Sequence, residues 1–191
     1  MEAVGPDAPT LCEGWTTRDL AAHLIVRGTR ADAAGGIVIP ALKGYLERVQ
    51  AKVATRPWPQ LLRDVRAKPW WAAAPLDEAI NRVEYFVHHE DVRRAQPGWT
   101  PRELPSGLSA ALWSRVRAQA KLALRRTPAQ VVVTAPGHGT VSGGKGGQMV
   151  DVTAEPQELL LFLMGRQPHS RVDVAGPDNI VGRMRSARYG I

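Results

Sequence analysis

The chain has 191 residues, of which 44% are hydrophobic and 23% are charged, the balance of a globular protein rather than a disordered one. No run of about 18 apolar residues occurs, so a membrane-spanning helix is excluded. The single cysteine, Cys12, excludes an internal disulfide framework and a multi-cysteine metal site. Residues 1–10 lack the basic and apolar regions of a signal peptide, so we expect a soluble cytoplasmic protein.

Residues 1–126 show the apolar spacing of helices. The first helix is predicted to begin at Thr16, which has the spacing of a capping box with Asp19, and to end near Arg27. Further helices are predicted at 41–55, around 61–65, at 76–95 and from 106 onward. Short connections join these helices, which is typical of an up-and-down bundle.

The pattern changes after Pro128. Predicted elements are strands at 130–134 and 149–153, a helix at 155–164, a strand at 171–174 and a helix at 178–187. We therefore expect a mainly α protein: a helical bundle, residues 1–126, followed by a small α+β subdomain, residues 127–191, with the order β-β-α-β-α. The glycine-rich stretch 143–147 is predicted to be a flexible hairpin turn, because it lacks the residues that follow the lysine in a phosphate-binding loop.

The helix at 76–95 carries ionisable residues on the face that should meet the core. Steps of three and four residues along this face pass Ile80, Glu84, Val87, His88 and Asp91. A buried carboxylate costs several kcal/mol unless a partner compensates it, and a cation shared by Glu84 and His88 is the simplest partner. The alternative is an ordinary hydrogen-bonded Glu–His pair.

A third ligand is available in the first predicted helix, where His23 lies near the apolar side. With Glu84 and His88, it would form a site of two histidines and one carboxylate, which leaves positions open for water or substrate. Zinc is the default ion for these ligands, with nickel, iron and manganese as alternatives. His89 competes as a ligand, but it lies about 100° around the helix from His88. Arg93 stands where a zinc protease motif would need its second histidine.

Two segments resemble the motifs of a known family. Residues 10–24, TLCEGWTTRDLAAHL, resemble the opening motif of mycothiol-dependent maleylpyruvate isomerase-like proteins, which belong to the wider DinB/YfiT-like group of metal-binding helical bundles. Residues 83–92, VEYFVHHEDV, resemble the second metal motif of that family, E-x-x-x-H-x-x-D. Residues 158–166, ELLLFLMGR, resemble its C-terminal region. The resemblance covers most of the chain.

The resemblance implies a divalent metal, usually zinc, held by His23, Glu84 and His88. In characterised relatives the metal binds the low-molecular-weight thiol mycothiol and presents it as a nucleophile to a small electrophilic substrate. A coordinated thiol loses its proton near neutral pH because the cation stabilises the thiolate. By analogy, Asp91 would orient a ligand or close the helix end.

The chain departs from the family at its beginning. Family members have a helix before the first motif, whereas residues 1–10 are too short and too rich in glycine and proline to form one. We therefore expect the bundle to lack the first helix of the family and to expose an apolar face, and so to form a homodimer or to be unstable.

Several other residues have two interpretations each. Cys12 is interpreted as a small packed residue rather than a reactive thiol. Trp70 and Trp71 are expected to pack in the core or an interface rather than to line a pocket. Arg166 could hold a substrate carboxylate, although the end of the preceding helix also favours a cation there.

These observations predict a thiol-dependent transferase or isomerase that needs a divalent metal, with no membrane partner. The alternative is a metal-binding protein without catalysis, whose site stabilises the bundle or senses a ligand. A third hypothesis is nucleic-acid binding through the formal charge of +7, from 25 Lys and Arg against 18 Asp and Glu. No recognition motif supports it, and the basic residues lie mostly on the polar sides of predicted helices.

Overall fold

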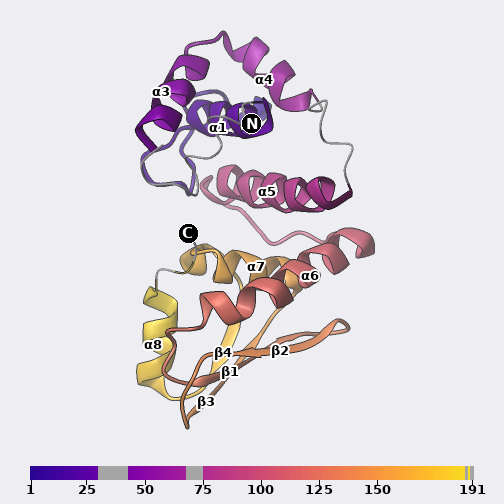
Figure 1. Cartoon of the computed structure of the whole chain (residues 1–191), viewed down its shortest axis with the longest axis vertical. Coiled ribbons are helices and arrows are strands. Elements are labelled where there is room, and N and C mark those ends of the chain that lie inside the picture. The colour runs from indigo at the N-terminus through magenta and orange to yellow at the C-terminus, as the bar shows by residue number, and fades with distance from the viewer. Residues whose placement is uncertain (30–42, 68–74, 188, 190–191) are drawn as a thin grey trace. The chain divides into compact units, whose positions relative to one another are not determined.

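The computed structural model describes residues 1–29, 43–67, 75–187 and 189 (Figure 1). They form two compact units, Met1–Thr100 and Pro101–Ile191. The chain is mostly helical with a small four-stranded sheet, as the sequence predicts at this level. None of the helices in the described residues is long and apolar enough to cross a membrane.

The first unit contains a short 3₁₀ helix, η1, and four α-helices. Their bounds are η1 Glu2–Val4, α1 Thr17–Thr29, α3 Lys43–Ala54, α4 Trp58–Arg66 and α5 Pro75–Arg94. α1, α3 and α5 agree with the predicted helices to within one or two residues wherever their ends are described, whereas α4 begins three residues before the predicted segment around 61–65. Trp70, Trp71 and the side chain of Ile80 lie outside the described part of the chain.

The predicted capping box begins α1. The Thr16 amide and hydroxyl both donate to Asp19 Oδ2, at 2.9 and 2.6 Å, and the Asp19 amide donates to Thr16 Oγ1 at 3.4 Å. These bonds satisfy donors of the first turn that have no partner within the helix. The start of α1, and with it the position of His23, is therefore determined locally.

The core of the first unit forms where α1 packs against α3 and α4. Ala21 and Ala22 allow close approach, and they are fully buried together with Val26 and with Leu61 of α4. This apolar contact sets the orientation of α1, because burial of hydrocarbon surface is the main favourable term in folding.

The boundary between the units differs from the predicted one. The apolar spacing predicts that residues 1–126 form the bundle, whereas α6, Ser106–Ala123, belongs to the second unit. The reason is packing: α6 buries Leu112, Trp113 and Val116 and lies against α7, Pro156–Leu163, and strand β2, Gly139–Gly143. Helical periodicity shows that a helix has an apolar face but not which element covers it.

The second unit builds a mixed sheet of four strands in the order β2-β1-β3-β4. The strands are β1 Gln130–Ala135, β2 Gly139–Gly143, β3 Met149–Thr153 and β4 Asp173–Ala175. β1 pairs antiparallel with β2 and parallel with β3, and β3 pairs antiparallel with β4. Helices α6 and α7 pack on the sheet (Figure 1), and every residue of α7 is buried. The unit also contains η4, Gln167–His169, and α8, Asp178–Ser186.

The sequence pattern does not predict one of the strands, so the order of strands and α-helices after α6 is β-β-β-α-β-α rather than β-β-α-β-α. The missed strand, β2, contains two glycines and no apolar alternation, and its residues are mostly exposed. The hairpin turn lies before β2, around Gly137, whereas residues 144–148 form the connection from β2 to β3. The prediction of a hairpin turn at 143–147 is therefore wrong.

Candidate metal centre

The candidate site lies in the first unit, where α1 and α5 bring three sequence-predicted ligands together. His23 follows the buried Leu20 by three residues on α1 and is itself only half-buried. Glu84 and His88 are one turn apart on α5, where Val83 and Val87 are buried. Each ligand therefore lies beside the apolar stripe that packs its helix, at the border between core and solvent.

The ligand atoms of His23, Glu84 and His88 all lie within 4.8 Å of one another. His88 Nε2 is 3.6 Å from Glu84 Oε2, and the rings of His23 and His88 meet edge to face with centroids 5.2 Å apart. Trp15 packs beside His23 at a centroid distance of 5.1 Å. Two imidazoles and a carboxylate thus converge on one point, as a divalent cation requires.

Asp91 determines which nitrogen of His88 faces this point. Its Oδ2 lies 3.0 Å from His88 Nδ1, and its side chain is completely buried. Nδ1 therefore carries the proton that Asp91 accepts, and Nε2 is left toward Glu84. A carboxylate behind a histidine in this way is common in metal centres, since it fixes the ring orientation and increases the basicity of the ligand nitrogen.

Cys12 joins the same network from the segment before α1. Its thiol donates to Asp91 Oδ2 at 3.3 Å, and the Leu11 amide donates to the Asp91 carbonyl oxygen at 3.0 Å. Cys12, His88 and Asp91 form a second group whose ligand atoms lie within 4.8 Å of one another. The sequence analysis interprets Cys12 only as a packed residue, because nothing in its spacing links it to residues 79 positions away.

The two histidines have opposite charge preferences. Burial, with the neighbouring His88 charge, lowers the pKa of His23 to about 4, so His23 is neutral at neutral pH. For His88, burial lowers the pKa, but hydrogen bonds with Asp91, Cys12 and Glu84 outweigh it and raise the pKa to about 10. In the metal-free chain, the His88 imidazolium is therefore the cation that compensates the carboxylates.

Glu84 remains ionised despite its burial. Desolvation raises its pKa, but the hydrogen bond with His88 and the charge of Arg27 lower the pKa by a larger amount. The pKa of Glu84 is therefore below its ordinary value. Arg27 Nε lies 3.6 Å from Glu84 Oε2 and comes from the same helix as His23, one turn later. The carboxylate is thus held between a guanidinium and an imidazole, in the charged form that a metal ion needs.

His89 does not compete for this site. Its side chain is 51% exposed, with Nδ1 4.0 Å from Glu90 Oε1, and it belongs to neither ligand group found in the described residues. Glu90 points the other way, into a buried cluster: its Oε2 accepts from Arg94 Nε at 2.7 Å, and the Arg94 guanidinium lies 4.6 Å from the Trp99 ring centroid. This cluster holds α5 in place from the face opposite the metal ligands.

Arg166 and two further histidines, His138 and His169, lie in the second unit. Arg166 donates to the Met164 carbonyl oxygen at 2.6 Å, which supports its interpretation as a cation at the end of α7. His138 lies 3.2 Å from Ser109 Oγ, and His169 lies in η4. Neither histidine belongs to a ligand group within the described ranges.

Comparisons of the chain with protein-family models, with curated proteins and with solved structures found no match. A function for this chain is therefore argued from its own geometry and from the two motifs in its sequence.

Proposed function

We propose that the chain binds a divalent metal ion through His23, Glu84 and His88. The observation that carries the proposal is their convergence within 4.8 Å, with the buried Asp91 accepting from His88 Nδ1. Nitrogen and oxygen donors of this kind suit zinc, and three protein ligands leave at least one position for water or a substrate. An open position of this kind is typical of a catalytic site rather than a structural one.

We further propose that the chain is a thiol-dependent transferase or isomerase acting on a small electrophile. The support is the resemblance of residues 10–24 and 83–92 to mycothiol-dependent maleylpyruvate isomerase-like proteins of the DinB/YfiT-like group. When bound, the metal would lower the pKa of a coordinated thiol and make a thiolate nucleophile available at neutral pH. Mycothiol is the expected co-substrate, and zinc the expected ion.

The chain's own residues prepare this site before any ligand arrives. His23 is neutral because its pKa is about 4, and its Nδ1 faces Gln50 Oε1 at 3.4 Å. A proton on Nδ1, donated to Gln50, leaves Nε2 with the lone pair that a metal needs. Arg27 would keep Glu84 charged and in position. Asp91 would hold the His88 ring through Nδ1, so that Nε2 faces the metal once the ion has displaced the proton from that nitrogen.

The first experiment measures metal content by elemental mass spectrometry in the wild type, His88→Ala and His89→Ala. His89 is the matched control, because it is the adjacent histidine and is largely exposed. We expect about one ion per chain in the wild type and in His89→Ala, and none in His88→Ala. No metal in the wild type after reconstitution, or retention in His88→Ala, would contradict the site.

The second experiment tests the reaction with the metal-loaded wild type, mycothiol and electrophiles such as maleylpyruvate. Consumption of the electrophile should require both the metal and the thiol, and should be lost in Glu84→Gln. Full turnover in Glu84→Gln or His88→Ala would exclude this chemistry. Metal binding without turnover would favour the non-catalytic alternative, in which the ion stabilises the helices or senses a ligand.

The second ligand group favours that alternative. An ion held by Cys12, His88 and Asp91 would use the His88 Nδ1 side, with two buried ligands and the half-buried Cys12. Cys12→Ser distinguishes the two placements, since it removes a ligand only from the second group. Loss of the metal in Cys12→Ser, with retention in Glu84→Gln, would assign the ion to the buried group.

A further inference from the structure

The net charge of the chain is concentrated in the second unit. Residues 101–191 contain twelve Lys and Arg against six Asp and Glu, a formal charge of +6, whereas residues 1–100 contain thirteen against twelve. The metal ligands all lie in the first unit, so the proposed metal chemistry does not account for this excess. Such an asymmetry between the halves of a chain suggests a separate anionic ligand.

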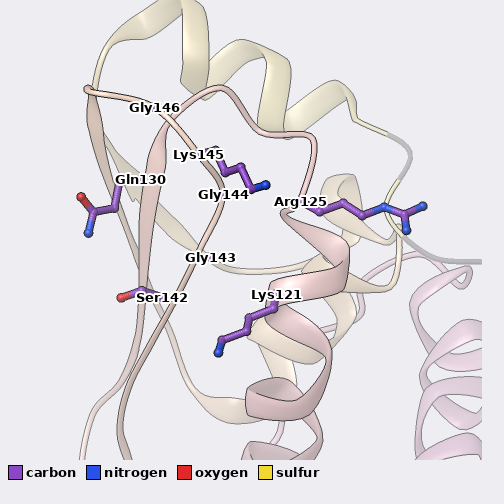
Figure 2. A pocket seen from close by; sticks show the side chains of 8 residues that line it. All are labelled: Lys121, Arg125, Gln130, Ser142, Gly143, Gly144, Lys145 and Gly146. Atoms are coloured by element: carbon purple, nitrogen blue, oxygen red, sulfur yellow. The ribbon is translucent and has the colours of Figure 1, made fainter.

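Part of the excess surrounds one hollow of about 420 Å³ in the second unit. Its lining consists of Lys121, Arg125, Gln130, Ser142, Gly143, Gly144, Lys145 and Gly146, and contains no acidic residue. Figure 2 shows the Lys121 and Lys145 side chains between α6 and the strands that carry Gln130 and Ser142, whereas the Arg125 guanidinium points away from these two amines. Among the described residues, none of these three cations forms an ion pair with a carboxylate.

The position of Lys145 is fixed by the backbone on both sides of it. Gly144 and Gly146 have φ of +77° and +158°, and a Cβ on either would collide with the carbonyl oxygen of Ala129 or Pro128. The Lys145 amide itself donates to the Thr127 carbonyl oxygen at 3.1 Å. The connection from β2 to β3 therefore crosses the chain entering β1 at close range, and it presents Lys145 at a fixed place rather than on a flexible loop.

The end of α6 explains only part of this arrangement. Cations are favourable at the C-terminal end of a helix, which accounts for Lys121 and Arg125. Lys145 comes from a different segment, and bringing a third cation beside these two is unfavourable unless an anion compensates the repulsion. The amine of a lysine and the guanidinium of an arginine are donors only, so the ligand must supply the acceptors.

We propose that this hollow binds the phosphate group of a small phosphorylated molecule. A phosphate monoester carries a charge between about −1.5 and −2 and three acceptor oxygens, which matches a set of cations better than a single carboxylate does. The volume lies within the range of about 300 to 1,000 Å³ that is usual for small-ligand sites. Backbone amides are not the main donors, which distinguishes this site from a phosphate-binding glycine-rich loop: the glycines here position a lysine.

Calorimetric titration of the full chain tests the proposal, with ribose 5-phosphate as the probe and ribose as its uncharged match. A chelator is present throughout, so that phosphate bound to a metal ion does not contribute to the signal. Because His88 lies in the other unit, His88→Ala should bind ribose 5-phosphate as tightly as the wild type does. We expect saturable binding of ribose 5-phosphate alone, weakened about tenfold or more in both Lys121→Gln and Lys145→Gln. Failure of the metal site would leave these results unchanged, so the two proposals fail separately.

Arg115→Gln is the matched control, because it removes one exposed positive charge from the same helix but does not line the hollow. We expect it to change the affinity less than about twofold, as for a distant screened charge. Equal losses of affinity for ribose 5-phosphate in all three variants would overturn the proposal in favour of a diffuse basic surface. Tight binding of a single-stranded oligonucleotide, weakened equally by all three substitutions, would overturn it in the same way. Absence of saturable binding in the wild type would also overturn it.

Discussion

At the scale of single residues, the first unit depends on carboxylates that are buried and fully engaged. Asp91 accepts from His88 Nδ1 and from the Cys12 thiol, and Glu90 accepts from Arg93 and Arg94. These neighbours in sequence point to different clusters, one behind the candidate metal ligands and one around Trp99. A substitution of either carboxylate therefore tests its own cluster and leaves the hydrogen bonds of the other carboxylate in place.

Replacement of Asp91 by Asn should weaken metal binding without removing a ligand of the His23–Glu84–His88 site. The amide can still meet His88 Nδ1, but it has no charge to increase the basicity of the ring, so we expect a loss of about 10- to 100-fold in metal affinity. Competition with a fluorescent chelator measures this, and circular dichroism checks that the fold is intact. Unchanged affinity in a folded Asp91→Asn protein would show that Asp91 does not support the site.

The Glu90–Arg94 pair should dominate the acid sensitivity of the first unit. Burial raises the pKa of Glu90, but hydrogen bonds from Arg93 and Arg94 outweigh it and lower the pKa to about 2, from an ordinary value of 4.5. The stabilisation is therefore complete above pH 4.5 and is lost as the pH falls from 4.5 toward 2. Glu90→Gln removes this contribution and takes the carboxylate away from Arg94, which is only 2% exposed.

Urea unfolding from neutral to acid pH measures this prediction. We expect Glu90→Gln to lower the free energy of unfolding by about 3 kcal/mol at neutral pH and to flatten its decline in acid. The exposed Glu13, changed to Gln, is the control and should have little effect. An equal effect of the two substitutions would mean that the buried pair is not important for stability.

At the scale of elements, the connection between β2 and β3 has to cross from one side of β1 to the other. β2 runs antiparallel to β1 and β3 runs parallel to it on the other side, so residues 144–148 must pass the start of β1 within five residues. This close approach explains why residues 144 and 146 are glycines, although the sequence alone suggests a flexible segment there. The same constraint holds Lys145 in the proposed phosphate site.

Gly144→Ala should therefore destabilise the second unit strongly. The substituted residue would need a left-handed backbone, at φ +77°, and its Cβ would collide with the Ala129 carbonyl oxygen. We expect a loss of about 2 kcal/mol or more in the free energy of unfolding. Gly147→Ala is the matched control, since a Cβ there meets nothing within 4 Å and its φ is not in the left-handed region, and it should be close to neutral. Similar stability of the two variants would refute the close crossing.

At the scale of the whole molecule, the two units carry different chemistry: ligands for a metal in residues 1–100, and most of the net charge in residues 101–191. The predicted homodimer and the thiol co-substrate remain predictions at this scale. A metal that joins α1 to α5 should stabilise only the unit that contains both helices.

Scanning calorimetry with and without zinc tests this coupling. An ion present at 1,000 times its dissociation constant stabilises the folded state by about 4 kcal/mol. We expect zinc to raise the melting temperature of the first unit and to leave the second unit unchanged, with no effect in His88→Ala. The Gly144→Ala variant identifies the transition of the second unit by lowering it. An equal shift of both transitions would contradict a site confined to the first unit.

Much of the local structure follows from sequence signals alone. The capping box at Thr16 begins α1, and hydrophobic spacing places most helices and three of the four strands, because these signals come from residues close together in the chain. The same spacing selects Glu84 and His88 as one pair on a helix face. His23 was added from its place near an apolar side and from the motif at 10–24.

The contacts between helix and strand faces became known only from the packing of the folded chain. Cys12 lies beside Asp91 although 79 residues separate them, α6 packs against α7 rather than within the first unit, and β2 is a strand despite its glycines. Contacts between distant segments depend on how whole elements pack, and periodicity within one element carries no information about its partner. For the same reason, the hollow around Lys121 and Lys145 had no signal in the sequence beyond a lysine among glycines.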